Sequence, residues 1–184
     1  MREDIERWNR KYSRVAEHIE ARAEPELEQY QGVLHKHGIA LELACGKGAN
    51  ALYLAGLGFD VIAADGSVEG LKVCQRSADK LNLSIFPVVM DFDQCVLPKG
   101  RFDLISVVRY LNRSLLTDLA DALKPQGILF YKTFNLRHLR QQPGFNPDYL
   151  LQDDELQQAF GDFEMIAQSQ SGPSSFVLAR KRSS

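Results

Sequence analysis

The chain has few cysteines and no long apolar run, and each shortage excludes a class of protein. Its 184 residues include three cysteines, Cys45, Cys74 and Cys95, with no CxxC pair and no histidine at zinc-ligand spacing, so no metal site is expected. No window reaches the roughly 20 apolar residues that span a bilayer, and charged residues directly follow Met1. We therefore expect a cytoplasmic protein that is not bound to a membrane.

The sequence also lacks an excess of positive or negative charge. The formal net charge is −2 and the sequence contains no long block of lysine or arginine. Non-specific binding to nucleic acid depends on neutralising many phosphates, so a nucleic-acid partner is not expected. The apolar fraction of 45% suits one globular domain over residues 1–184, and a monomer is the default expectation.

From residue 38 onward, short apolar runs alternate with helical patterns. The predicted strands are 39–44, 60–64, 84–90, 102–108, 128–134, 163–168 and 175–179, and the predicted helices are 49–57, 68–81, 113–123 and 153–160. Such alternation is typical of βαβ units in a parallel sheet, and the short turn over 170–173 favours an antiparallel hairpin. The sequence thus predicts an α/β fold, with a doubly wound, mostly parallel seven-stranded sheet over 38–184 that closes in an antiparallel hairpin.

The first 37 residues predict a helical cap. Apolar residues recur at three- and four-residue intervals, which indicates one helix over 3–22, and a second helix is expected over 26–35 after Pro25. The stripe consists of Ile5, Trp8, Tyr12, Val15 and Ile19.

Polar and glycine residues follow four of the predicted strands, at the edge where doubly wound sheets bind ligands. The loop 44–50 contains Gly46 and Gly48, which let the backbone approach a ligand closely, although an ordinary strand-to-helix turn uses glycine too. Asp65 ends the second strand, and its carboxylate could accept both hydroxyls of a ribose or merely cap the next helix. Together these features favour an adenosine-type ligand. Asp91-Phe92 follows the third strand and the cationic loop 108–113 the fourth.

The order of these motifs resembles the class I methyltransferases that use S-adenosylmethionine, and particularly the small tellurite-resistance and thiopurine methyltransferases. Residues 41–48 (LELACGKG) look like the first motif, 50–55 (NALYLA) like the helix that continues it, and 123–129 (LKPQGIL) like the turn into the fifth strand. Two positions depart from the pattern, because Ala44 and Gln126 stand where glycine is commoner.

The resemblance implies a Rossmann-like methyltransferase fold, S-adenosylmethionine as the cofactor, and a set of contact residues. The implied cofactor residues are Tyr12, Glu42, Ala44, Cys45, Gly46, Gly48, Asp65, Gly66, Ser67, Asp91, Phe92 and Val108. Glu42 and the glycine loop would hold the methionine part, Asp65 the ribose, and Asp91 with Phe92 the adenine. For Trp8 and Tyr12, packing on the core is a competing interpretation.

A small-molecule acceptor is expected next to the loops after the fourth and fifth strands. The implied acceptor residues are Arg109, Tyr110, Arg113 and Phe134. Arg137 and Arg140 add cationic charge, and Phe145 a second apolar wall, which suggests a small, anionic or soft nucleophile. Ordinary surface charge explains these arginines equally well, and the sequence assigns no catalytic residue.

Two other functions compete with methyl transfer. Gly46, Gly48 and Ala51 satisfy the G-x-G-x-x-A spacing of a nicotinamide-dependent oxidoreductase. Against this, Glu42 would repel a pyrophosphate, and the chain leaves little room for a second, substrate-binding domain. A module that binds S-adenosylmethionine without turning it over also remains open.

Overall fold

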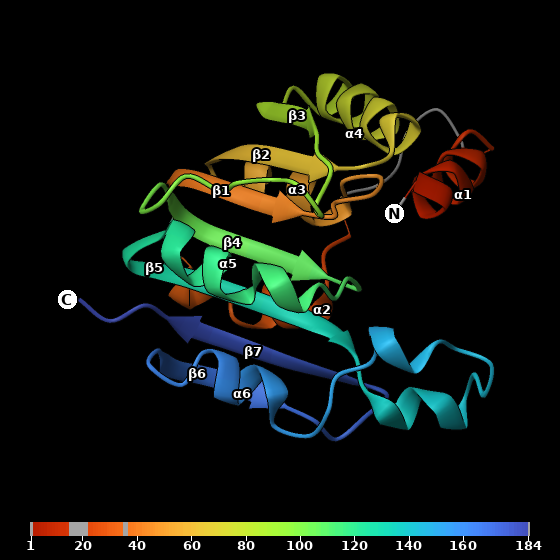
Figure 1. The fold of residues 1–184 in the computed structure, drawn as a ribbon. Helices are drawn as coiled ribbons and strands as arrows, with labels where there is room; N and C mark the ends of the chain where they lie inside the picture. Colours follow the sequence, from red (N-terminus) through yellow and green to blue (C-terminus); the bar gives the residue numbers. More distant parts are fainter. Residues whose placement is uncertain (1, 15–21, 35–36, 184) are drawn as a thin grey trace. The chain divides into compact units, whose positions relative to one another are not determined.

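Seven strands form one sheet in the order β3-β2-β1-β4-β5-β7-β6 (Figure 1). The computed structural model describes residues 2–14, 22–34 and 37–183. The pairs β1–β2, β2–β3 and β4–β5 are parallel, whereas β7 pairs antiparallel with both β5 and β6. The strands are β1 Gly38–Leu43, β2 Phe59–Asp65, β3 Ile85–Val89, β4 Phe102–Val108, β5 Leu123–Phe134, β6 Glu164–Ser169 and β7 Ser174–Arg180. This arrangement confirms the predicted α/β fold, its mostly parallel sheet and its closing antiparallel hairpin.

The chain divides into two compact units, residues 1–95 and 96–184. The first contains β1–β3 and the helices α1 Arg2–Tyr12, α2 Pro25–Gln29, η1 Gln31–Val33, α3 Ala49–Gly56 and α4 Val68–Leu81. Helix α3 packs against β1 and β2, α4 packs against β2 and β3, and α1 lies on α4. The expected division into a cap over 1–37 and a core over 38–184 stays a prediction.

Local sequence explains the boundaries of α4, which match the prediction. The side chain of Ser67 accepts a hydrogen bond from the Gly70 N–H at 3.1 Å and so caps the first turn. Asn82 ends the helix in a left-handed conformation with φ of 53°, which asparagine tolerates better than most residues. Between these caps, the buried residues recur at helical spacing; they are Gly70, Leu71, Val73, Cys74, Ser77 and Ala78.

The second unit contains β4–β7 with short helices between them. These are η2 Arg113–Leu115, α5 Leu116–Ala122, η3 Leu136–Arg140, η4 Pro147–Tyr149 and α6 Glu155–Ala159. Figure 1 shows the β7 arrow running opposite to those of β4 and β5. The helix predicted over 153–160 is present as α6, which is shorter than expected.

Two predicted boundaries in the second unit are wrong. The helix expected over 113–123 begins as a 3-10 turn and ends at Ala122, and β5 begins at Leu123 rather than Ile128. Leu123 pairs with Phe102 at the start of β4, and the proline that follows Lys124 disfavours the helical region for that residue. Gln126 has a positive φ of 65°, a conformation that glycine adopts more easily, as the resemblance implies for this position.

The N-terminal helices are shorter than expected. Helix α1 ends at Tyr12, and the predicted stripe residues Val15 and Ile19 lie outside the described residues. The second predicted helix is split into α2 and the turn η1, and its expected end at His35 also lies outside the described residues.

Candidate functional site

The loop after β1 turns through three left-handed residues before α3 begins. Ala44, Gly46 and Gly48 have φ angles of 57°, 56° and 85°. A Cβ atom at Gly48 would overlap the sulfur of Cys74 on α4, so this position leaves no room for a side chain. Ala44 carries a Cβ in the same unfavourable region, which explains why glycine is commoner there. The result is a backbone cradle at the carboxyl end of β1.

Asp65 fastens this cradle to the end of β2. Its Oδ2 accepts the Gly46 N–H at 2.7 Å, and its Oδ1 accepts the Ser67 N–H at 2.7 Å. Burial raises the pKa of the Asp65 carboxyl, and these two hydrogen bonds only partly offset that effect. A carboxylate has about four acceptor positions, so Asp65 retains capacity for the hydroxyls of a ligand.

Glu42 places a second carboxylate next to the same loop. It lies at the end of β1 with a side chain that is 2% exposed. Its Oε1 accepts a hydrogen bond from Asn50 Nδ2 at 3.0 Å, and Asn50 Oδ1 in turn accepts the Glu24 N–H at 2.9 Å. This chain of contacts orients a buried carboxyl group next to the cradle.

The pKa values of the two cysteines near the cradle reflect both its burial and its carboxylates. Burial, together with the nearby carboxylates of Glu42 and Asp65, raises the pKa of Cys74 to about 12. Burial likewise raises the pKa of Cys45, with Asp65, Cys74 and Glu42 adding to the shift. Burial disfavours a charge of either sign, but the contribution of Glu42 and Asp65 to both shifts disfavours an anion such as pyrophosphate and favours a cation. This donor set therefore fits a cationic adenosyl ligand.

The predicted adenine contacts follow β3. Asp91 is exposed, and its two carboxylate oxygens accept hydrogen bonds from the Asp93 N–H at 3.0 Å and from Gln94 Nε2 at 3.2 Å. Phe92 is buried, with 5% of its surface exposed. The loop joins the site through the Met90 N–H, which donates to the Asp65 carbonyl at 3.0 Å. Their roles toward adenine stay predictions.

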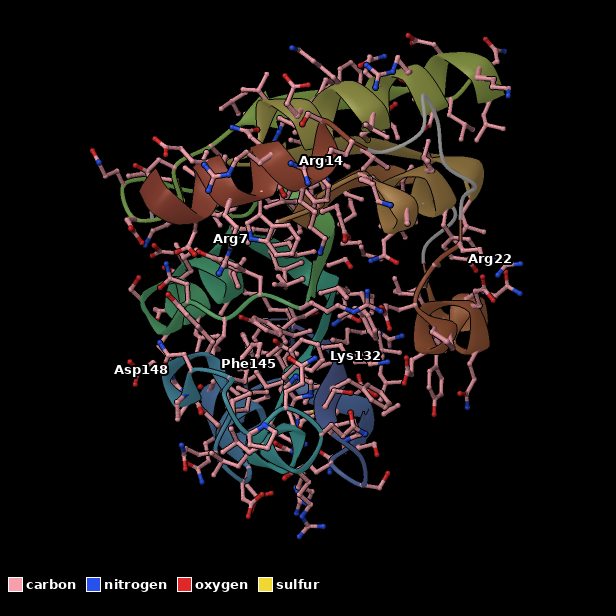
Figure 2. The ribbon with its side chains drawn as sticks, turned by 90° about the vertical axis from the view of Figure 1, so that its right-hand side faces the viewer. Arg7, Arg14, Arg22, Lys132, Phe145 and Asp148 are labelled. Atoms are coloured by element: carbon pink, nitrogen blue, oxygen red, sulfur yellow. The ribbon has the colours of Figure 1, made fainter. Side chains whose placement is uncertain are left out.

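Helix α1 rests on the glycine-rich loops after β1 and β2 (Figure 2, red beside olive α4). A Cβ at Gly46 would lie 2.7 Å from the Tyr12 hydroxyl, and one at Gly66 would lie 2.9 Å from Cγ1 of Ile5. Asn9 Oδ1 accepts hydrogen bonds from the Ser67 hydroxyl at 2.7 Å and from the Glu69 N–H at 3.2 Å.. Tyr12 therefore does lie against the predicted cofactor loop.

Sequence analysis did not single out Asn9, Gly70 or Cys74, which shape this site. Gly70 lies inside α4, where a Cβ would be 2.7 Å from the Gly46 carbonyl oxygen and 3.0 Å from Tyr12. A glycine within a helical pattern is the usual signal of such a close approach and could have been used. Asn9 and Cys74 carry no comparable local signal.

In the second unit, the loop after β4 begins with a left-handed residue. Arg109 has a φ of 56°, and its N–H donates to the Lys132 carbonyl at 2.8 Å. The Tyr110 carbonyl accepts the buried Tyr131 hydroxyl at 3.1 Å. Val108 is half-buried at the end of β4. The expected contacts of Val108, Arg109 and Tyr110 with ligands stay predictions.

Arg113, which was expected to bind an acceptor, holds the chain segment around η4. Its Nε and Nη2 donate to the two carboxylate oxygens of Glu155 at 2.6 and 3.0 Å. Its Nη1 donates to the Asp148 carbonyl at 2.7 Å, and Nη2 also donates to the Leu150 carbonyl at 2.9 Å. All three guanidinium nitrogens of Arg113 therefore donate hydrogen bonds within the protein, which gives this side chain a structural role.

We predict that Arg113→Ala lowers the free energy of unfolding by about 1–2 kcal/mol, because it removes a two-pronged ion pair and two carbonyl contacts. Arg113→Lys should recover little of this, since an ammonium lacks the planar fork. Urea unfolding measures the change, with the exposed Arg140→Ala as the control. Equal stability of the Arg113→Ala and Arg140→Ala variants would contradict the structural role.

Phe134, the other predicted acceptor residue, belongs to a ring cluster after β5. Its ring stacks on His138 with centroids 4.1 Å apart, and Phe145 meets both rings edge-on at 5.8 and 5.0 Å. Phe145 is labelled in Figure 2, among the loops of this segment. The buried Asn135 starts the segment, and a bridge to Leu151 closes it. Sequence analysis did not single out His138, and no local pattern marks it.

Two further observations concern the described residues as a whole. Within them, no helix combines the length and the apolar character that crossing a membrane requires. The same part of the chain shows no group of three histidine, cysteine or acidic side chains placed to hold a metal ion.

The chain is similar to known methyltransferases. Residues 40–127 match a family model described as a methyltransferase domain. TehB of Haemophilus influenzae, named a probable S-adenosyl-L-methionine-dependent methyltransferase, is 29% identical over 86 residues, which cover 46% of this chain and 30% of TehB. The ubiquinone biosynthesis O-methyltransferase of Glaesserella parasuis is 30% identical over 105 residues, covering 52% and 44%. The chain thus spans less than half the length of either relative.

Solved structures share the whole fold. The crystal structure of Haemophilus influenzae TehB has a TM-score of 0.77 at 18% identity, over 97% of this chain and 67% of TehB. The [4+2]-cyclase SpnF has a TM-score of 0.68 at 17% identity, over 86% of this chain and 80% of SpnF. At these identities, the likeness establishes the fold. The domain match over residues 40–127 and the fold make the chain similar to the class I S-adenosylmethionine-dependent methyltransferases, TehB among them, and this likeness implies S-adenosylmethionine as the cofactor.

Proposed function

We propose that this chain binds S-adenosylmethionine and transfers its methyl group to a small-molecule acceptor. The observation that carries the proposal is the pair of carboxylates next to the glycine cradle, Glu42 at the end of β1 and Asp65 at the end of β2. A sulfonium and an ammonium group are stabilised by such a site, whereas a phosphate is repelled. The O-methyltransferase name of one relative supports a small acceptor.

Each residue of the cradle would have a distinct task. Asp65, already oriented by the Gly46 and Ser67 N–H groups, would accept the ribose hydroxyls. Glu42 would balance the positive charge of the methionine part from its buried position. Tyr12 would cover the cradle and exclude water, because its ring already lies on Gly46. When bound, the cofactor supplies an electrophilic methyl group, so the protein's work is to bind and align.

The two alternatives receive less support. A nicotinamide-dependent oxidoreductase would place a pyrophosphate beside Glu42, which is electrostatically unfavourable, whereas Asp65 suits the ribose of either ligand. A module without methyl transfer remains a candidate because fold does not determine chemistry, as the cyclase SpnF illustrates. Formation of S-adenosylhomocysteine with any acceptor would exclude that second alternative.

The first test is thermal unfolding with S-adenosylmethionine, S-adenosylhomocysteine, NAD⁺ and NADPH. A ligand at about 100 times its dissociation constant stabilises the folded state by roughly 2.7 kcal/mol, which is on the order of 5–10 °C for a domain of this size. We expect this rise with the two adenosyl compounds only, and its loss in Asp65→Ala. The control is Asp60→Ala, an exposed aspartate at the start of the same strand.

The outcomes separate the three functions. A rise with the nicotinamides alone would favour the oxidoreductase. A rise with the adenosyl compounds that Asp65→Ala leaves intact would overturn the assigned role of Asp65. An unchanged midpoint with all four compounds would contradict the proposed function.

The raised pKa of Asp65 predicts a pH dependence of ligand affinity. Only the ionised carboxylate can accept both ribose hydroxyls, so affinity should fall as the pH drops through a pKa that lies above the ordinary value of 3.8. Calorimetric titration with S-adenosylhomocysteine between about pH 7.5 and pH 4.5 measures the fall. In Asp65→Asn, affinity should be low and independent of pH over this range.

Stability without ligand should change in the opposite sense. Because folding raises the pKa of Asp65, the carboxyl stabilises the folded state fully below its unfolded pKa, and this contribution is lost as the pH rises through the folded pKa.

For the affinity experiment, a constant affinity for S-adenosylhomocysteine down to the ordinary aspartate pKa would contradict the assignment of Asp65 to the ribose.

We infer further that the protein acts as a cytoplasmic monomer without a nucleic-acid partner. Cys45, Cys74 and Cys95, all among the described residues, are thiols in the structure, which suits a reducing compartment. The net charge of −2 supports the absence of non-specific nucleic-acid binding. Sedimentation of the purified chain, alone and with RNA, tests both inferences.

A further inference from the structure

His138 is a buried polar side chain inside an otherwise aromatic cluster. It lies in η3 and is 5% exposed, with Phe134 stacked on it and Phe145 against its edge. Its Nδ1 atom is buried and has no hydrogen-bond partner among the described residues. Leaving such an atom unpaired costs about 1–3 kcal/mol. A phenylalanine ring could make the same stack without this cost, so packing does not account for the nitrogen.

The segment that carries His138 is anchored around it. Asn135 accepts the Arg137 N–H at 2.9 Å and donates to the Gly172 carbonyl and to the Ser175 hydroxyl, both at 3.0 Å. At the far end, the Leu151 N–H donates to the Phe134 carbonyl at 2.9 Å. The rings of Phe134 and His138 are therefore presented by a fixed framework.

Phe145 comes from a more exposed part of the chain than the other two rings. It is half-buried, between exposed residues on both sides, and a Cβ at the preceding Gly144 would meet nothing within 4 Å. Displacement of Phe145 would open a flat, apolar slot against His138. A ligand ring could occupy that slot and bring a hydrogen-bond donor to Nδ1.

The charges nearby do not favour an anion. The guanidinium of Arg113 is bound by Glu155 at 2.6 Å, and that of Arg137 contacts Asp153 at 3.3 Å. Two of the four arginines that suggested an anionic acceptor are thus compensated by carboxylates. Recognition by ring stacking and one hydrogen bond accounts better for the residues that surround His138.

We propose that Phe134, His138 and Phe145 form an acceptor subsite for a flat, apolar molecule that carries one O–H or N–H donor. The ligand ring displaces Phe145 and its donor binds Nδ1 of His138. A phenol is the simplest molecule of this class. The inference rests on the proposed function and specifies its acceptor.

The test uses phenol and fluorobenzene, which share a flat ring but differ in the donor. Both are titrated into ¹⁵N-labelled protein while the imidazole nitrogens are followed by NMR. Of the four histidines, the His138 signal is the one that disappears in His138→Phe. We expect phenol to shift the Nδ1 resonance saturably, and fluorobenzene to bind at least about tenfold more weakly because it leaves that acceptor unpaired.

His138→Phe provides the matched variant. It should unfold at the same temperature as the wild type or higher, because it removes an unpaired buried nitrogen, yet lose the preference for phenol. A preserved preference in His138→Phe, or a wild-type His138 signal that phenol does not move, would overturn the subsite. If the variant does not fold, the comparison of phenol with fluorobenzene on the wild type decides alone.

Binding of S-adenosylhomocysteine is measured on the same samples. His138→Phe should bind it with unchanged affinity, since the predicted cofactor residues do not include His138. A wild type that binds S-adenosylhomocysteine but shows no phenol effect at His138 would refute the subsite alone. Failure of the wild type to bind S-adenosylhomocysteine would instead refute the proposed function.

Discussion

Replacing Gly48 with alanine is expected to lower the free energy of unfolding by about 2–5 kcal/mol and to abolish binding of S-adenosylhomocysteine. A φ of 85° costs a residue with a Cβ about 1–2 kcal/mol. The new methyl group would also overlap the Cys74 sulfur, and overpacking of this kind costs typically 1–3 kcal/mol. Urea unfolding measures the stability, and calorimetric titration measures the binding.

Gly56→Ala is the matched control for this variant. Gly56 is the last residue of α3, has no positive φ, and a Cβ there would meet nothing within 4 Å. The alanine should therefore be neutral or stabilise by up to about 1 kcal/mol. If Gly48→Ala proves as stable as Gly56→Ala, the described packing of the loop on α4 is wrong.

A double variant separates overlap from backbone strain. Gly48→Ala combined with Cys74→Ala removes the sulfur but leaves the positive φ, so it should recover part of the lost stability and not all of it. Complete recovery would mean that strain contributes nothing. If the free-energy losses of the two single variants simply add up in the double variant, the sulfur does not limit the loop.

Asn135→Ala is the second large expected effect, with a loss of about 3 kcal/mol. The side chain is 1% exposed and makes three hydrogen bonds, each worth roughly 1 kcal/mol, and the mutation leaves their partners unsatisfied. Hydrogen exchange over residues 136–151 should become faster, because the segment loses its anchor to the turn before β7. Affinity for S-adenosylhomocysteine should remain, as the predicted cofactor residues exclude Asn135.

Asn146→Ala controls for the shared local role of the two asparagines. Asn146 caps η4 through the Asp148 N–H at 3.0 Å, as Asn135 caps η3, but Asn146 is exposed. Its loss should cost only about 0.5–1 kcal/mol. Equal destabilisation by the two variants would show that the cap, and not the buried contacts to Gly172 and Ser175, accounts for the effect of Asn135.

The amino-acid sequence by itself determined most of the architecture. Alternating apolar runs predicted all seven strands, and the bounds of α4 and β4 agree with the structure residue for residue. These features depend on local causes, such as the Ser67 cap and the periodic burial of one helix face. Where a distant partner decides, prediction failed: Leu123 is extended because it pairs with Phe102, 21 residues earlier.

The candidate site shows the same division. Glu42, the glycine loop and Asp65 were predictable because strand order brings the carboxyl ends of parallel strands to one edge. Only the tertiary structure placed Asn9 on Ser67, bound Arg113 to Glu155, and enclosed His138 between Phe134 and Phe145. The first two contacts join residues 58 and 42 positions apart, whereas the ring contacts are between near neighbours in an irregular segment that has no periodic pattern. A periodic pattern records which face of an element is buried, but not which side chain meets it there.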